Sequence, residues 1–156
     1  MREILFRGKT PSQDERFDDG EWVEGFYTRF NEKEHRIYSG YAETDCGDYY
    51  PDWCNVRPET VGQYTGLTDK NGKRIFEGDI IRFQKFKDEP LWIGVVVYEN
   101  CLYIAKGVMP LSYEKREGEK AAKHGFEVQV SGINKSTIEV IGNIHDNPEL
   151  MKGGAE

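Results

Sequence analysis

The chain has 156 residues, of which 31% are charged and 13% aromatic, and its formal net charge is −7. A chain of this length buries enough surface to fold without disulfides or a metal, and its composition is that of a globular protein. Its negative charge disfavours nonspecific binding to nucleic acid, because the phosphate backbone is itself polyanionic.

The sequence carries no signal for export or for a membrane. No apolar run approaches the roughly 18 residues that span a bilayer, and "MREILFRGK" lacks the apolar stretch of a signal peptide. The three cysteines, Cys46, Cys54 and Cys101, are an odd number that indicates reduced thiols and no disulfide framework. We therefore expect a cytoplasmic protein with no membrane contact.

The first predicted elements are strands. "REILFRG" reads as a short strand, and "EWVEGFYTRF" alternates in the manner of a longer one. One face of this longer strand carries Trp22, Phe26 and Phe30, and the other carries Val23, Tyr27 and Arg29. After the polar turn "NEKEH", the segment "RIYSGYA" continues as a second strand. Residues 21–42 are thus predicted to form a hairpin.

The next segment, "ETDCGDYYPDWCN", is predicted to be an irregular loop that carries Tyr49, Tyr50 and Trp53. Tyrosine and tryptophan on such a loop can anchor a partner protein or stack on a base. Alternatively, they fold back and cover one end of a small barrel. The sequence leaves both interpretations open.

The stretch "QYTGLTDKNGKRIFEGDIIRF", residues 63–83, predicts two strands around a tight turn. Asn71 and Gly72 both tolerate positive φ, which a type I′ hairpin turn requires. Asp69 is placed to accept hydrogen bonds from backbone amides of the same turn. Gly78 and Asp79 interrupt the second strand and indicate a bulge or bend that curls a sheet toward a barrel.

The second half continues with hairpins and a closing helical turn. "LWIGVVVYEN" and "CLYIAKGVM" are apolar runs joined by a short turn at Glu99-Asn100. "FEVQV" alternates, with Phe126, Val128 and Val130 predicted to point inward, and "STIEVIGNI" follows as a last strand. Asn147 as N-cap and Pro148 at the first helical position predict a single helical turn. The segment "SYEKREGEKAAKHG" lacks an apolar stripe and is expected to be a solvated loop or a frayed helix.

The sequence contains no recognisable catalytic or metal-binding motif. The glycines of residues 66–79 do not have phosphate-loop spacing. His35, Cys46 and Cys54 lack the close ligand pairs of structural zinc sites. There is no nucleophile elbow, and nothing assigns a partner to Cys101, His124 or His145. We expect Cys101 to be buried and His145 to act as a cap beside Asp146.

Carboxylate pairs are common in the chain, namely Asp18/Asp19, Asp45/Asp48 and Asp69/Asp79. An acidic surface produces such pairs by chance, whereas a hydrolase needs carboxylates that converge in a cleft. We therefore predict no catalytic residue, no metal and no cofactor, and expect a protein that is not an enzyme.

One short segment combines basic and aromatic side chains. Arg82, Phe83, Lys85 and Phe86 lie in "IIRFQKFK", and this pattern is compatible with a surface that binds single-stranded nucleic acid. A solvated edge strand explains the same pattern.

Three segments together resemble the YopX family of bacteriophage and prophage proteins. They are "MREILFRGK" with the following "DGEWVEGFY", then "VGQYTGLTDKNGKRIFEGDIIRF", and finally "EVIGNIHDNPEL". The resemblance covers nearly the full chain and implies a mainly β protein that is encoded by phage or integrated mobile elements and made in the cytoplasm of a bacterial host. It supplies no catalytic or ligand-binding residues. The family motif residues are turn and bulge types that specify backbone shape: Gly66, Asn71, Gly72, Gly78, Asp79, Gly142, Asn147 and Pro148.

The predicted fold is all-β and rich in hairpins. We expect an N-terminal β lobe over residues 1–60, a small SH3-like or partly open barrel over residues 61–152, and a flexible tail at 153–156. The alternative is that the two lobes form one single domain. A short helical turn closes the second lobe.

The predicted function is a phage or prophage accessory protein that binds a host or phage protein without catalysis. Nucleic-acid binding by the barrel and an unrecognised small hydrolase are the alternatives. A homo-oligomer is also compatible with the sequence, because hairpin-rich folds leave sheet edges that pair readily.

Overall fold

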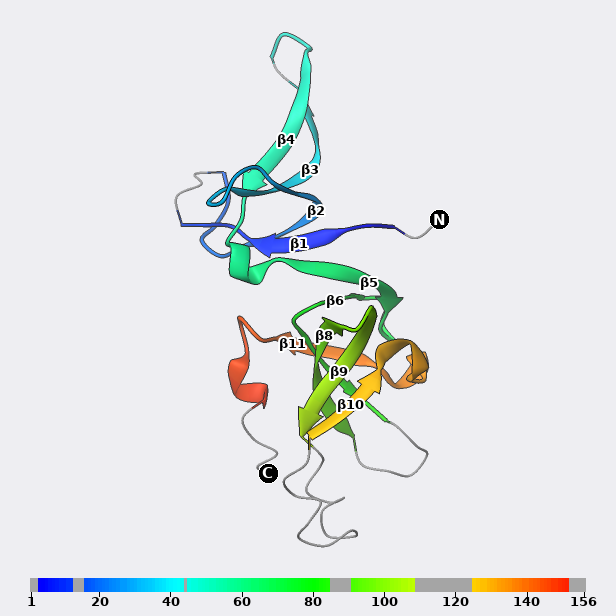
Figure 1. Ribbon diagram of the computed structural model, residues 1–156. Helices are drawn as coiled ribbons and strands as arrows, with labels where there is room; N and C mark the ends of the chain where they lie inside the picture. Colours follow the sequence, from blue (N-terminus) through cyan, green and yellow to red (C-terminus); the bar gives the residue numbers. More distant parts are fainter. Residues whose placement is uncertain (1–2, 13–15, 44, 85–90, 109–124, 152–156) are drawn as a thin grey trace, which may run out of the picture. The chain divides into compact units, whose positions relative to one another are not determined.

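The computed structural model describes residues 3–12, 16–43, 45–84, 91–108 and 125–151. The chain divides into two units, Met1–Tyr64 and Thr65–Glu156 (Figure 1). Both are built from antiparallel strands, and in the described part of the chain the helical segments are short 3-10 turns of three or four residues. The predicted all-β class is confirmed.

The first unit is an antiparallel sheet with the strand order β4-β3-β2-β1-β5. Its strands are β1 (Phe6–Lys9), β2 (Trp22–Arg29), β3 (His35–Glu43), β4 (Tyr49–Asn55) and the start of β5 (Gly62–Thr68), which follows the 3-10 turn η1 (Pro58–Thr60). Strands β2 and β3 pair from Phe26↔Tyr38 to Arg29↔His35, so the hairpin predicted for residues 21–42 is confirmed.

One face of this sheet forms the core of the first unit. Val23, Ile37, Cys54 and Val56 are buried together, with Phe17 packed against them. Ile37 lies directly opposite Cys54 across the β3–β4 ladder, so both side chains point to the same face of the sheet. The Cys54 thiol therefore contributes packing, and the other face of β2–β4 is left to solvent or to partners.

The predicted irregular loop over residues 43–55 is wrong, because most of it is strand β4. Strand β4 pairs with β3 from Arg36↔Asn55 to Glu43↔Tyr49, with a register shift between Tyr38 and Gly40. Pro51 has no N–H to donate, which disfavours a position in the middle of a sheet. It is accommodated here because β4 is the edge strand of the sheet, where an N–H is not needed.

The second unit holds a five-stranded antiparallel sheet in the order β10-β9-β8-β7-β11. Its strands are β7 (Asp79–Phe83), β8 (Trp92–Glu99), β9 (Leu102–Val108), β10 (Gly125–Gln129) and β11 (Glu139–Asn143). Strand β6 (Arg74–Phe76) pairs with β5 and not with this sheet. The strand order has two ends, so within the described residues the sheet is open, as expected for a partly open barrel and unlike a closed one.

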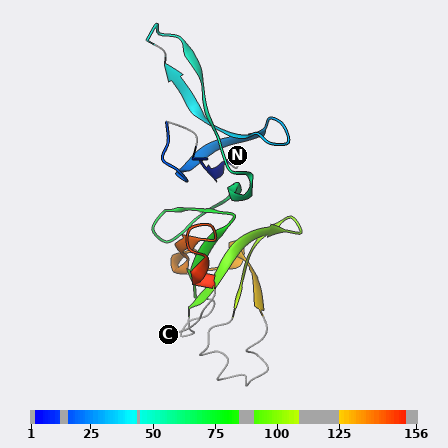
Figure 2. The ribbon, with the colours of Figure 1, turned by 90° about the vertical axis from the view of Figure 1, so that its left-hand side faces the viewer.

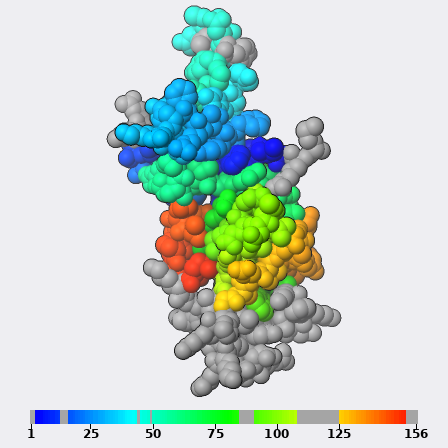
Figure 3. All heavy atoms as spheres, in the orientation of Figure 1, coloured from blue at the N-terminus to red at the C-terminus, as the bar shows by residue number. Residues whose placement is uncertain are grey.

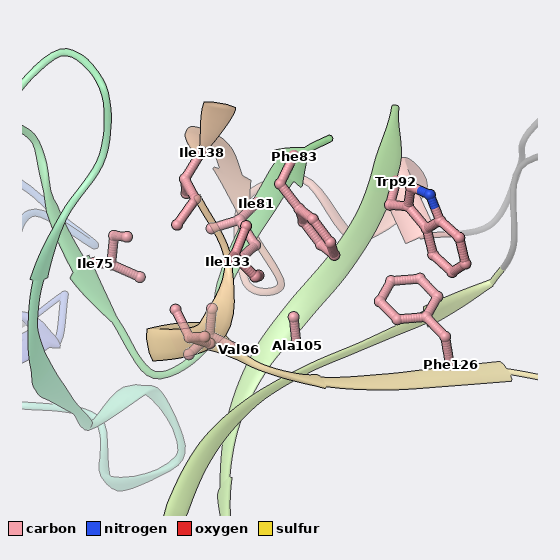
Figure 4. Close-up of a cluster of buried hydrophobic side chains, with 10 residues drawn as sticks. Ile75, Ile81, Phe83, Trp92, Val96, Ala105, Phe126, Ile133 and Ile138 are labelled. Carbon is pink, nitrogen blue, oxygen red and sulfur yellow. The ribbon is translucent and has the colours of Figure 1, made fainter. Parts of the chain in front are cut away.

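Apolar side chains from strands β6 to β10 and from the segment between β10 and β11 fill the core of the second unit (Figure 4). The ring of Phe126 meets Trp92 edge-on with centroids 4.8 Å apart, and it meets Phe83 similarly at 5.8 Å. Phe126 and Val130 are buried and Val128 packs against the same cluster, which confirms the predicted inward face of this strand.

The turns of the second unit differ in type from those expected. Gly72 has a φ of +83°, but Asn71 does not have positive φ, so the predicted type I′ turn at Asn71-Gly72 is wrong. The loop has three residues, 70–72: Asp69 N donates to Lys73 O, and Gly72 N donates to Asp69 O. This is a type I turn that ends in a left-handed glycine.

A two-residue loop with positive φ occurs instead between β8 and β9. Glu99 lies opposite Leu102, and Asn100 and Cys101 between them have φ values of 49° and 65°. The hairpin itself was predicted, with its turn placed one residue too early. Cys101 is exposed, so its predicted burial is wrong.

The remaining predicted elements follow the sequence closely. Strand β11 pairs with β7, and its register shifts between Val140 and Gly142, which marks a bulge. The predicted helical turn is the 3-10 segment η5 (Pro148–Met151). Two further 3-10 turns, η3 (Val130–Gly132) and η4 (Lys135–Thr137), connect β10 to β11. The prediction for residues 112–125 lies outside the described residues, except that Gly125 begins β10.

Candidate functional site

Strands β3 and β4 extend beyond the rest of the first sheet as a two-stranded ribbon. The pairing of β2 with β3 ends at Phe26↔Tyr38, whereas β3 continues to pair with β4 as far as Glu43↔Tyr49. We call residues 38–53 the aromatic arm. It projects from the other strands of its unit in two views (Figures 1 and 2), and its atoms form a narrow column in the space-filling view (Figure 3).

The arm exposes aromatic rings on both of its faces. Tyr41 lies opposite Pro51 and is 75% exposed, and Tyr50 lies opposite Ala42 and is 48% exposed. Because the two pairs are adjacent along the ribbon, these tyrosines point to opposite sides. The backbone of Tyr49 is part of β4, and its side chain lies outside the description.

The base of the arm carries a cluster of rings around one arginine. The guanidinium carbon of Arg36 lies 4.0 Å from the ring centroids of both Phe30 and Trp53. Glu34 accepts a hydrogen bond of 2.7 Å from Nη2 of the same arginine. Phe30 is nevertheless 62% exposed, so this stack is open to solvent on one side.

The rings at the base share one face of the sheet. Phe26 lies opposite Tyr38, and Tyr38 lies opposite Trp53, so all three point to the same side. This is the face opposite the core, and Phe26 is 68% exposed on it. The outer face of β2–β4 is therefore an aromatic surface that continues into the arm.

Asp52 anchors the arm to the N-terminal part of its unit. Its Oδ2 accepts a hydrogen bond of 3.0 Å from Ser39 Oγ, and its Oδ1 lies 3.5 Å from Arg16 Nη1. Arg16 also donates to the Trp53 carbonyl at 2.8 Å. These polar contacts hold the register where β3 bulges at Ser39.

The basic and aromatic residues predicted for the second unit do not form a surface of that kind among the described residues. Phe83 is fully buried in the core, and Arg82 donates a hydrogen bond of 2.8 Å to Glu139 Oε2. Lys85 and Phe86 lie outside the described residues. Nucleic-acid binding by this segment therefore stays a prediction that depends on Lys85 and Phe86.

Glu139 is the centre of an ion network on β11. Its carboxylate accepts hydrogen bonds from Arg82 and, at 2.7 Å, from Lys70 Nζ. The pKa of Glu139 is lowered from 4.5 to about 2. The largest cause is the hydrogen bond from Arg82, and the next is the hydrogen bond from Lys70. This network joins the loop after β5 to strands β7 and β11.

Asp69 and Asp79 are buried and bind backbone amides. Asp69 Oδ1 accepts from the N–H groups of Asn71 and Lys73 at 2.8 and 2.9 Å, and Oδ2 accepts from Val140 N at 3.1 Å. Burial raises the pKa of Asp69, but the three backbone hydrogen bonds outweigh burial and place it below the usual range. Asp79 Oδ2 accepts from Phe76 N at 2.8 Å.

The family motif residues lie at turns, bulges and caps. Gly66 within β5 and Gly78 between β6 and β7 each have a φ of +83°. Gly142 lies in the β11 bulge, where an added Cβ would lie 2.7 Å from Asn147 Oδ1. Pro148 begins η5, and Leu150 N donates to Asn147 O.

In the described part of the chain, no group of three or more His, Cys, Asp or Glu side chains is placed to hold a metal ion. Tyr27 Oη and His35 Nδ1 share a hydrogen bond of 2.5 Å, and Cys46 is exposed. His145 is exposed, and its backbone N–H donates to Asn143 Oδ1.

Among the described helical segments, none is long and apolar enough to cross a membrane.

Sequence reasoning found part of this surface. Tyr50 and Trp53 were predicted binding residues and do lie in the arm, whereas Tyr41, Phe30 and Arg36 were not proposed. The strand alternation had already placed Phe26 and Phe30 on one face. It could not show which face is buried, because both faces of β2 carry large apolar side chains.

Comparison with known proteins identifies relatives by family and by fold. The family model described as YopX protein matches residues 11–152. None of the curated proteins matches the sequence. Among solved structures, the crystal structure of protein EF1440 from Enterococcus faecalis is similar, with a TM-score of 0.51 and 21% identity, covering 97% of this chain and 99% of that chain. At this identity the likeness concerns the fold alone.

Proposed function

The chain belongs to the YopX protein family, and on this premise we propose that it is a phage or prophage accessory protein that binds another protein in the bacterial cytoplasm. The binding is non-enzymatic, and the contact surface is the aromatic arm. The single observation that carries the proposal is the ribbon of β3 and β4, which extends beyond its sheet with Tyr41 and Tyr50 exposed on opposite faces.

Two physical arguments support the arm as a binding surface. A two-stranded ribbon is only marginally stable in water, so a partner that covers it stabilises it directly. Tyrosine and tryptophan bury a large area with few rotatable bonds, and for that reason they dominate the binding energy of protein interfaces. The arm and its base present several such rings to solvent, beyond what packing of the first unit uses.

Charge favours a protein partner over a nucleic acid. Residues 1–64 contain fourteen Asp and Glu against eight Lys and Arg, so the unit that carries the arm is strongly acidic. A polyanion gains its affinity from released counterions and needs a basic surface. In the second unit Arg82 is paired with Glu139, which weakens the nucleic-acid alternative.

The test is affinity capture from a host lysate with nuclease present, comparing the wild-type chain with the variant Tyr41→Ser/Tyr50→Ser. We expect at least one protein that the wild type retains and the variant loses. That protein, purified, should bind the wild type directly and the variant at least ~10-fold more weakly, in line with interface tyrosines whose truncation costs well over 1 kcal/mol.

The matched control is Tyr98→Ser, which removes a tyrosine of similar exposure, 49%, from the second unit. It should retain the partner. Equal capture by the wild type and the arm variant, or capture that nuclease abolishes, would contradict the proposal. Arm-dependent recovery of the chain itself would assign the surface to self-association.

A further inference from the structure

The charge of the aromatic arm distinguishes it from the rest of its own unit. Between Arg36 and Arg57 the sequence contains no Lys or Arg, while it contains the carboxylates Glu43, Asp45, Asp48 and Asp52. Asp52 is paired with Arg16, whereas Glu43 and Asp45 are exposed near the tip. The arm is therefore an aromatic ribbon with a negative end.

In the same sheet, cationic side chains lie over aromatic rings, and over the Trp22 ring Arg7 lies closer than Lys9, whose Nζ is 5.5 Å from the ring centroid. Arg36 is stacked between Phe30 and Trp53 while Glu34 accepts its hydrogen bond. In the same unit the guanidinium of Arg7 lies 4.5 Å from the Trp22 ring centroid. Ring faces attract cations, and a planar guanidinium stacks on them better than an ammonium does.

We propose that the partner segment bound by the aromatic arm is rich in arginine. This inference rests on the proposed function and adds the chemistry of the partner. Guanidinium groups of the partner stack on Tyr41 and Tyr50, as Arg36 stacks on Phe30 and Trp53. Other arginines of the partner pair with the carboxylates at the tip of the arm. Complementary charge also speeds encounter between the two surfaces.

The experiment titrates the full chain into fluorescein-labelled hexa-arginine, hexa-lysine and hexa-glutamate peptides and follows fluorescence anisotropy. We expect hexa-arginine to bind about 3-fold or more tightly than hexa-lysine, because stacking adds to charge. Hexa-glutamate should not bind. The affinity for hexa-arginine should fall as salt rises, because exposed charges are screened.

Two arm variants separate stacking from charge. Tyr41→Ser/Tyr50→Ser should reduce the preference for arginine over lysine, and Tyr41→Phe/Tyr50→Phe should retain it, because the rings remain. Asp45→Asn/Asp48→Asn should weaken both cationic peptides, by about 3-fold or more. The control Glu59→Gln/Glu149→Gln removes the same charge at exposed positions outside the arm and should change affinity less than 2-fold, as screening at a distance requires. Circular dichroism checks that each variant is folded.

The outcomes separate this inference from the proposed function. Equal affinity for arginine and lysine peptides, or equal loss in the arm and control variants, would show general charge attraction and overturn the inference. An arm-dependent protein partner whose contact segment lacks arginine would overturn it too, while leaving the proposed function intact. Arm-dependent peptide binding without any arm-dependent protein partner would instead contradict the proposed function.

Discussion

At the residue scale, Asp69 links its own loop to strand β11. One buried side chain accepts hydrogen bonds from two amides of its own loop and from Val140 on β11. The first two were foreseeable, because aspartate at this position of a turn commonly binds nearby backbone N–H groups. The third was not, because it joins residues that are far apart in sequence.

The substitution Asp69→Asn tests that third contact. An amide oxygen can still accept from the loop, but the amide nitrogen would face Val140 N, a donor that would then be unsatisfied. We expect a loss of about 1–3 kcal/mol in the free energy of unfolding. Asp69→Ala, which leaves all three donors unsatisfied, should lose more. Urea unfolding measures both, and an Asn variant as stable as the wild type would mean that the link to β11 contributes nothing.

The backbone conformation of Cys101 has a cost in folding free energy that can be tested. Its φ of 65° lies in the left-handed region, where a side chain is disfavoured. Cys101→Gly should therefore raise the free energy of unfolding by about 0.5–1 kcal/mol, after allowing for the greater freedom of glycine in the unfolded chain. Cys101→Ala keeps the Cβ and should differ little from the wild type. If Ala and Gly stabilise equally, the gain comes from removing the thiol and the backbone explanation is wrong.

At the element scale, we expect two glycines of the first sheet to respond oppositely to substitution by alanine. A Cβ at Gly25 would lie 2.0 Å from the Tyr38 carbonyl oxygen, whereas a Cβ at Gly40 would meet nothing within 4 Å. Gly25→Ala should push β2 away from β3 and cost about 1–3 kcal/mol. Gly40→Ala should be tolerated within about 0.5 kcal/mol. Thermal unfolding compares the two, and similar losses would contradict the β2–β3 register.

Sequence reasoning identified the elements better than their connections. Alternation located β2 and β10, because a half-buried strand imposes a period of two, and an apolar run located β8. It failed at β4, where Pro51 and Gly47 resemble a loop and only pairing with β3 makes a strand. It also placed the type I′ turn at Asn71-Gly72, although the chain forms the two-residue turn at Asn100-Cys101. Loop length is fixed by strand register, which a single sequence does not contain.

The aromatic arm was only half predictable for a related reason. Tyr50 and Trp53 drew attention because tyrosine and tryptophan dominate interfaces. The arginine stack at the base needed the pairing of β2, β3 and β4, which brings residues 30, 36 and 53 together. Patterns within one strand reveal a face, whereas a site composed from three strands depends on their register.

At the scale of the whole molecule, negative charge is divided unequally between the units. Residues 65–156 contain fourteen acidic and thirteen basic residues, so almost all of the net charge belongs to the first unit. Ion pairs in the second unit, such as those of Glu139, therefore act within nearly balanced surroundings. Their effect on stability is best seen by changing pH, which removes the carboxylate charge without a mutation.

Acid should destabilise the second unit through Glu139. Its pKa is lowered from 4.5 to about 2 by Arg82 and Lys70, so the folded state binds the proton less readily than the unfolded state does. The stabilisation is therefore fully present above pH 4.5 and is lost as the pH falls toward 2. Glu139→Gln should lower the urea midpoint at pH 6 to 7, and this difference from the wild type should shrink progressively between pH 4.5 and 2. The exposed substitution Glu149→Gln is the control. A Glu139→Gln deficit that stays constant across this pH range would mean that the side chain acts by packing, and that its charge contributes nothing to stability.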